Sequence, residues 1–194
     1  FAKQLERYSF QAHGSRKSGI IQVTRCGQEV LERTACEIEE TTGNIIVRFE
    51  VGFPARGRTI QAGELIKILY QYLPACVEKA LYYKNMDQNA VKRAAELSVD
   101  QEYIREQLKK EGLIAFVADG SILPRESGVS QRPMKDAVPF VSPDSMKVTM
   151  KLPYKGVLTG MGIRKGITLV VGGGYHGKST LLKALESGVS PTIA

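Results

Sequence analysis

The spacing of hydrophobic residues predicts short strands followed by a long helical stretch in the first part of the chain. Residues 20–24 and 44–53 alternate as half-buried strands do, and the second run ends in glycine and proline. Residues 62–84 carry leucines at four-residue spacing, which predicts an amphipathic helix. Pro74 lies inside this pattern, so we expect a kink or a restart there.

A second helix and a buried strand are predicted next. Ser98 with Gln101 fits a capping box at a helix start, and Gly112 stands where a helix C-cap glycine belongs. The apolar run 113–118 then has the length and composition of a buried strand. A helix followed by such a strand indicates an α/β fold.

Residues 119–143 differ from the rest because they are rich in glycine, proline and serine and have no clear period. Alternation resumes at 145–153, which predicts another strand. The expected organisation is an N-terminal α/β region (1–118), a basic Gly/Pro-rich connector (119–144) and the start of a nucleotide-binding domain (145–194).

Composition and charge narrow the class of protein. The chain has 194 residues, and its net charge of +7 is concentrated in residues 121–194, which hold ten basic and four acidic groups. Such an excess suits a polyanionic ligand, although a solvated basic face explains it equally well. No apolar run reaches the ~20 residues that span a bilayer. Cys26, Cys36 and Cys76 are widely spaced, which predicts free thiols and no cysteine-type metal site.

The chemistry is concentrated in residues 172–179, which read GGGYHGKS and match the GxxxxGK[ST] phosphate loop in full. An apolar run, 167–171, precedes the loop and predicts a strand. Leu181, Leu182 and Leu185 follow it and predict the buried side of a helix. Strand, loop and helix together make the motif specific.

The loop type determines what each residue is expected to do. Its backbone N–H groups and the helix N-terminus attract the phosphates of ATP. Lys178 should reach the β- and γ-phosphates as the catalytic residue, Ser179 should bind Mg²⁺, and Thr180 should lie near the α-phosphate. The predicted nucleotide-binding residues are Gly172, Gly173, Gly174, Tyr175, His176, Gly177, Lys178, Ser179 and Thr180. The glycines do not fit GxGxxG, so a dinucleotide site is disfavoured.

The amino-acid sequence around the loop resembles that of a known family. Gly166 before the run 167–171, together with GKSTLL after it, is similar to ABC-type nucleotide-binding domains. The stretch 170–189, VVGGGYHGKSTLLKALESGV, more specifically resembles the predicted ATPases of the ABC class, which are stand-alone proteins. Further stretches agree with that family: 27–34, 116–125, 127–134, 137–145 and 160–163.

The resemblance implies a soluble ATPase that hydrolyses ATP with Mg²⁺ and works as a homodimer without a membrane partner. A strand ending in Asp-Glu and an ABC signature segment do not follow the loop. We therefore expect this chain to be an N-terminal part of a longer protein and to be inactive alone. The expected location is intracellular, in the cytoplasm or in an organelle matrix after loss of a transit peptide.

Two functions compete for the whole protein. The first is an ATPase that acts on a macromolecule, with RNA as a candidate. The second is a nucleic-acid-binding module whose nucleotide site is regulatory. Arg125, Arg132 and Lys135 could contact nucleotide, a dimer partner or nucleic acid, or make only local ion pairs. A kinase is disfavoured because the loop comes so late in the chain, and a transporter subunit by the long N-terminal region.

Overall fold

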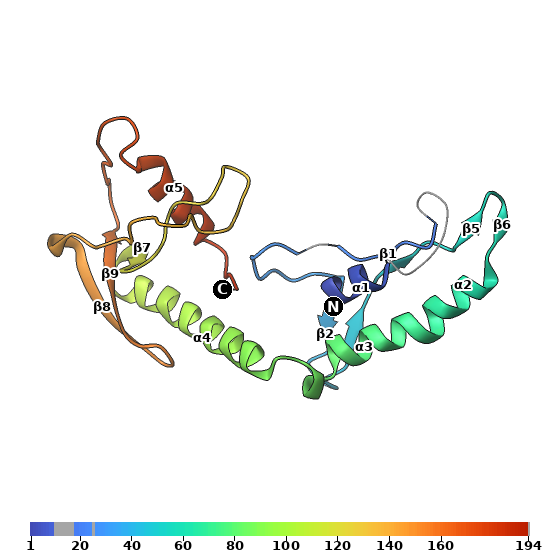
Figure 1. Cartoon of the computed structure of the whole chain (residues 1–194). Coiled ribbons are helices and arrows are strands. Elements are labelled where there is room, and N and C mark those ends of the chain that lie inside the picture. The colour runs from blue at the N-terminus through green and yellow to red at the C-terminus, as the bar shows by residue number, and fades with distance from the viewer. Residues whose placement is uncertain (10–17, 25, 194) are drawn as a thin grey trace. The chain divides into compact units, whose positions relative to one another are not determined.

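The computed structural model describes residues 1–9, 18–24 and 26–193, which form two compact units (Figure 1). The first unit contains residues 1–27 and 31–92, and the second contains residues 28–30 and 93–194. This division differs from the expected boundary at 119–144. Residues 93–118 lie in the second unit because most of helix α4 (Gln88–Lys110) and strand β7 (Leu113–Ala118) pack with later strands.

The first unit contains short strands that pair in three antiparallel couples. These are β1 (Ile21–Gln22) with β4 (Glu50–Val51), β2 (Cys36–Ile38) with β3 (Ile45–Val47), and β5 (Ala55–Arg56) with β6 (Thr59–Ile60). The strand expected at 44–53 is therefore two strands with different partners. The chain changes partner at Arg48 and Phe49, where the N–H of Arg48 donates to the carbonyl of Ala35.

The helices of the first unit supply most of a small apolar core. They are α1 (Ala2–Ser9), α2 (Ala62–Lys67), the π-helical segment η1 (Ile68–Tyr72), α3 (Leu73–Leu81) and the 3₁₀ turn η2 (Tyr83–Asn85). The expected interruption near Pro74 is confirmed as this π segment, since proline has no N–H to donate. The buried residues are Leu5, Ile21, Ile68 and Cys76. Burial raises the pKa of the Cys76 thiol.

The second unit is built on a three-stranded antiparallel sheet in the order β7–β9–β8. After the 3₁₀ turn η3 (Asp144–Met146), β8 (Lys147–Leu152) confirms the strand expected at 145–153, and β7 confirms the one at 113–118. The central strand, β9 (Gly156–Arg164), was not expected from its glycine-rich sequence. Gly160 and Gly162 lie where neighbouring strands leave no room for a side chain.

Helices cover both faces of this sheet, so the unit has α/β layers. On one face Leu113, Met150 and Leu152 pack against Tyr103, Ile104 and Leu108 of α4. On the other face Val117, Met161 and Ile163 pack against Leu181 and Leu185 of α5 (Lys178–Ser187). A register shift between Leu113 and Ala115 puts Leu113 on the α4 face, although Ala115 and Val117 lie on the α5 face. The α/β fold class is thus confirmed.

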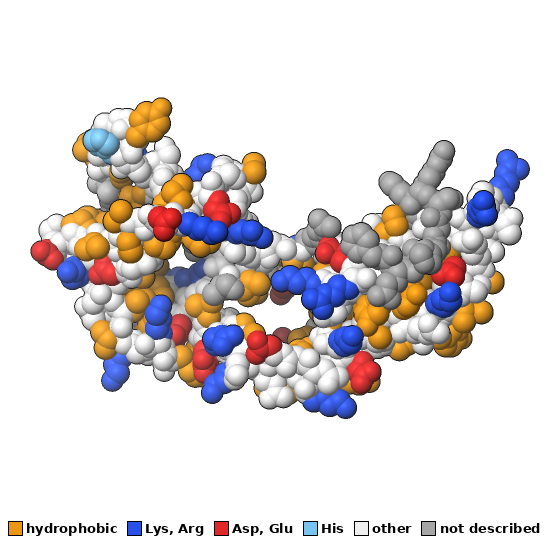
Figure 2. All heavy atoms as spheres, in the orientation of Figure 1, with side chains coloured by type: hydrophobic (Ala, Val, Ile, Leu, Met, Phe, Trp, Pro, Cys, Tyr) orange, Lys and Arg blue, Asp and Glu red, His pale blue; other side chains and the backbone are white. Residues whose placement is uncertain are grey.

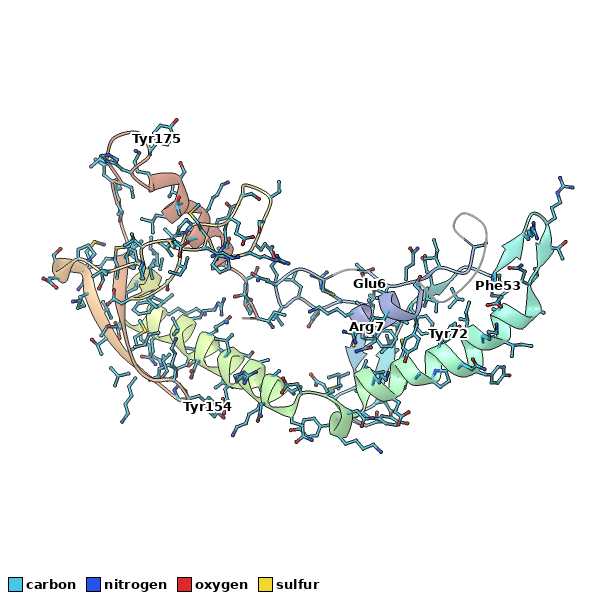
Figure 3. The ribbon with its side chains drawn as sticks, viewed as in Figure 1. Glu6, Arg7, Phe53, Tyr72, Tyr154 and Tyr175 are labelled. Carbon is cyan, nitrogen blue, oxygen red and sulfur yellow. The ribbon has the colours of Figure 1, made fainter. Side chains whose placement is uncertain are left out.

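Helix α4 begins ten residues before the expected start. Its first turn is capped by Asp87, whose Oδ1 accepts the N–H of Ala90 at 3.0 Å, so Ser98 lies inside the helix and the predicted capping box is wrong. The buried carboxylate of Asp100 instead accepts the N–H groups of Tyr154 and Lys155, each at 2.9 Å. These two bonds attach α4 to the β8–β9 turn, where Tyr154 lies (Figure 3).

Candidate phosphate-binding loop

The phosphate loop (residues 172–180) leads directly into α5. Gly177 has a φ of 79°, a left-handed conformation that glycine adopts without a steric cost, and it precedes the first helical residue, Lys178. The carbonyl of Gly177 accepts the N–H of Leu181 at 2.9 Å and closes the first helical turn. Tyr175 also has a positive φ, 63°, which is uncommon for a bulky residue and indicates a constrained loop.

Lys178 turns back across the loop that precedes it. Its Nζ donates to the carbonyl oxygen of Gly172 at 2.7 Å and also to that of Gly173. The two bonds join the first residue of the helix to the start of the loop and fix the ammonium group beside Gly172 and Gly173. A positive charge in this place, next to a helix N-terminus, is an arrangement that attracts phosphate.

The ring of His176 approaches Gly172 and Gly173 at the start of the loop, a contact that the sequence did not indicate. A Cβ built on Gly173 would lie 3.1 Å from Cε1 of His176, and one on Gly172 would lie 3.6 Å from its Cβ. The close approach explains why a side chain at position 173 would force the ring to move. His176 is itself exposed, so this contact lies at the surface of the loop.

The other predicted loop residues point to solvent or to the helix. Tyr175 is fully exposed, and its side chain projects away from the loop (Figure 3). Gly174 and Ser179 are also exposed, whereas Thr180 is half-buried in the first turn of α5. The structure thus places all nine predicted residues on one continuous loop and helix start.

The strand expected at residues 167–171 is not formed, so that prediction is wrong. A strand requires a hydrogen-bonded neighbour, and none of the described residues pairs with this segment. Ile167 is fully exposed, and Leu169 is 82% exposed. The loop therefore follows an extended, unpaired segment.

Arg125 and Arg132 lie in a hairpin (residues 123–134) beside α5. An antiparallel bridge joins Arg125 to Pro133, and the N–H of Glu126 donates to the carbonyl of Arg132 at 3.0 Å. The guanidinium of Arg125 donates to the carbonyl of Ile122 at 2.9 Å. Lys135 follows the hairpin and is exposed. The hairpin lies along α5, and Arg125 lines a groove between the two, whereas Arg132 and Lys135 do not line it.

Residues 28–30 are hydrogen-bonded to the residues that follow α5 and to the hairpin. The N–H of Val30 donates to Pro191 at 2.7 Å, and the N–H of Ile193 donates to Gln28 at 2.9 Å. The side chain of Gln131 in the hairpin contacts both Gln28 and Glu29. Gln101 of α4, expected as a capping residue, instead exchanges two hydrogen bonds with the backbone of Thr192, at 2.7 and 3.0 Å.

Metal clusters, cysteine pairing and membrane-spanning helices can be assessed for residues 1–9, 18–24 and 26–193, which the structure describes. Among these, no cluster of three or more His, Cys, Asp or Glu side chains could hold a metal ion. Cys26 and Cys36 are exposed and Cys76 is buried, and all three are free thiols. None of the helices described is both long and apolar enough to cross a membrane.

Comparison with known proteins assigns the family. The family model for the P-loop domain of ABC ATPases matches residues 87–194, which are more than half of the chain. The family model for the N-terminal domain of ATPases of the ABC class matches residues 1–84. An uncharacterized protein of Methanocaldococcus jannaschii is 28% identical over an alignment of 130 residues that covers 63% of this chain and 29% of that protein. The chain thus spans under a third of that relative's length. The chain belongs to the ATPases of the ABC class.

Proposed function

We propose that residues 172–180 bind the triphosphate of ATP with Mg²⁺ and that the whole protein hydrolyses ATP while acting on a macromolecule. The observation that supports this most directly is the position of Lys178, whose ammonium group is held across the loop by the carbonyls of Gly172 and Gly173. Lys178 would contact the β- and γ-phosphates and neutralise charge that develops during phosphoryl transfer.

Ser179 fits the expected metal ion. Mg²⁺ commonly takes one or two protein oxygens and fills its other positions with phosphate oxygens and water. The hydroxyl of Ser179 is exposed in the first turn of α5, next to the lysine, and offers one such oxygen. The metal would supply neutralisation of the phosphate charge. Thr180 would contact the α-phosphate.

Lys178→Ala tests this proposal in the whole protein. We expect ATP affinity, measured by calorimetry with Mg²⁺, to fall at least about tenfold, since a charge-assisted contact is lost, and turnover to fall with it. Lys165→Ala is the matched control, because it removes the same charge from an exposed site before the loop. Unchanged ATP affinity and turnover in Lys178→Ala would contradict the proposal.

We also propose a homodimer of the whole protein and, as the macromolecule to test first, single-stranded RNA. The basic excess of residues 121–194 supports a polyanionic partner, although Figure 2 shows basic and acidic side chains interspersed on the visible face. The alternative function is nucleic-acid binding with a regulatory nucleotide site. RNA affinity that falls steeply with salt but does not stimulate turnover would favour that alternative.

A further inference from the structure

A cavity of about 590 Å³, here called the edge cavity, lies in the second unit along β7. β7 forms its floor and is an edge strand, since among the residues that the structure describes it pairs with β9 alone. The walls come from α4 and the end of α5, the helices that cover the two faces of the sheet (Figure 1). The volume is within the range of ligand sites, ~300–1,000 Å³.

The free edge of β7 carries unused hydrogen-bonding capacity. An edge strand presents a row of backbone N–H and C=O groups that no neighbour pairs. β7 has six residues, so the row is about 20 Å long at ~3.3 Å per residue. Ile114 on this strand is 56% exposed, whereas the other residues of β7 are buried or half-buried. An edge of this kind can bind an extended peptide, whose main chain supplies the missing hydrogen bonds.

The charged residues that line the edge cavity are all basic. Arg105 and Arg125 line it, and no acidic residue does so in the part of the chain that the structure describes. Arg105 donates to the carbonyl of Gly188 at 3.3 Å, and Arg125 donates to that of Ile122 at 2.9 Å. A guanidinium has five N–H groups, so one carbonyl leaves donors for a further partner. Two such groups favour a ligand with carboxylates.

The two arginines approach the edge cavity from opposite faces of the sheet. Arg105 belongs to α4, which covers one face. Arg125 belongs to the hairpin, which begins with Leu123 packed on the α5 face and lies along α5. Side chains of an extended strand point alternately to the two faces. A strand added to β7 would therefore present one residue to Arg105 and the next to Arg125, so two neighbouring acidic residues suit this pair.

Apolar side chains at the edge cavity suit the residues beside such an acidic pair. Ile114 on the floor and Val189 after α5 line it and are 56% and 78% exposed. Covering them with apolar side chains of a ligand is favourable. A nucleic acid also carries negative charge, but its sugar–phosphate backbone has no N–H groups to pair with a strand edge. The combination of charge, apolar surface and free edge thus favours a peptide.

We propose that the edge cavity binds an extended segment of a partner protein that carries two neighbouring acidic residues. The segment adds to β7 as a further strand, its carboxylates pair with Arg105 and Arg125, and its apolar side chains cover Ile114. The site is separate from the phosphate loop, because α5 contributes to it only from Ala184 onward, more than a helical turn after Thr180.

Peptide binding to the whole protein, measured by fluorescence anisotropy, tests this inference. The acidic probe is Thr-Val-Glu-Glu-Val-Thr, blocked at both ends and equal in length to β7, six residues. Arg105→Ala is expected to weaken its binding about tenfold, and Arg125→Ala, at a more exposed position, about threefold. The matched control is Arg93→Ala, which removes an exposed guanidinium of α4 outside the cavity and should leave the affinity unchanged.

Two further arms separate the charge from the strand. A second peptide has lysines in place of the glutamates. The double variant Arg105→Glu/Arg125→Glu should lose the acidic probe and bind the lysine peptide, a gain that misfolding cannot produce. The acidic probe N-methylated at every residue keeps its charge but donates no backbone hydrogen bond, and it should bind at least about tenfold more weakly.

Each arm has an outcome that overturns the inference. If the wild type does not bind the acidic probe, or binds the lysine peptide equally well, the cavity is not a site for acidic segments. If the methylated probe binds as tightly as the unmodified one, no strand is added to β7. If single-stranded RNA displaces the probe and itself binds more weakly to both alanine variants, the site holds nucleic acid. Lys178→Ala should leave the affinity for the probe unchanged, so the result does not depend on ATP binding at the phosphate loop.

Discussion

Strand β9 and the segment 167–171 follow one another in the second unit, but only β9 forms a strand. Both are apolar. β9 is paired on both sides, and its residues Met161 and Ile163 are only 6% and 5% exposed. Ile167 and Leu169 in the next segment are largely exposed, and no described residue pairs with that segment. In this chain a partner strand, and not hydrophobicity alone, determines where a strand forms.

The comparison has a consequence for the phosphate loop, which follows the unpaired segment. The loop's shape depends on its own bonds, those of Lys178 to Gly172 and Gly173, and on the helix after it. That helix is anchored to the sheet through Leu181 and Leu185. Changes in the segment 167–171 should therefore have little effect on stability, whereas changes in β9 should have large effects.

The largest contrast is expected between two isoleucines. Ile163→Ala should lower the free energy of unfolding of the second unit by about 3 kcal/mol, because it leaves a cavity between the sheet and α5. Ile167→Ala, the matched control, should change it by less than about 0.5 kcal/mol. Urea unfolding of both variants measures the difference. A cost for Ile167→Ala similar to that of Ile163→Ala would show that residues 167–171 are packed in solution.

A pair of glycines tests the same contrast with added volume. A Cβ on Gly160 of β9 would overlap the carbonyl oxygen of Val117 and lie 2.8 Å from Cα of Ala118, so Gly160→Ala should cost about 2 kcal/mol. Gly174 in the phosphate loop has no atom within 4 Å of a built Cβ, and Gly174→Ala should leave the urea midpoint unchanged. Equal urea midpoints for the two variants would mean that β9 is not closely packed against its neighbouring strands at Gly160.

Local patterns predicted part of this structure. Residues 113–118 and 145–153 were predicted as strands because apolar and β-forming residues dominate them, and the phosphate loop followed from its spacing. β9 was missed because Gly160 and Gly162 give no strand signal; close packing requires them there. The capping box at Ser98 was a coincidence of spacing, since Asp87 caps the helix.

For the candidate site, the sequence indicated which residues form the loop but not what lies beside it. The packing of His176 on Gly173 depends on how the loop folds back. The groove joins residues of the hairpin to residues of α5 about fifty positions later, and no local pattern encodes such a pairing. Only charge singles out Arg125 in the sequence, and the structure adds that it lines the same groove as Glu186 and Met134.

A smaller effect is expected from acid, and it concerns the loop that joins β7 to β8. The carboxylate of Asp119 accepts hydrogen bonds from the N–H of Ser142 at 2.6 Å and from its hydroxyl at 3.0 Å. These bonds, the backbone one above all, lower the pKa of Asp119 below its ordinary value. A lowered pKa in the folded state stabilises the fold above the unfolded-state pKa of about 4.

That stabilisation should disappear as the pH falls below about 4 and Asp119 becomes protonated. We expect Asp119→Asn to unfold at lower urea than the wild type at pH 7 and to approach the wild type at pH 3. Asp144→Asn is the control, because this exposed carboxylate bonds only to Lys147 among the contacts described, and it should keep the wild-type pH dependence. Parallel pH curves for Asp119→Asn and the wild type would show that the bonds to Ser142 do not hold this loop on the sheet. If Asp119→Asn is less stable than the wild type only at neutral pH, the loop after β7 is held by the hydrogen bonds of a charged carboxylate. It would then differ from the segment 167–171, for which the structure describes no such contact.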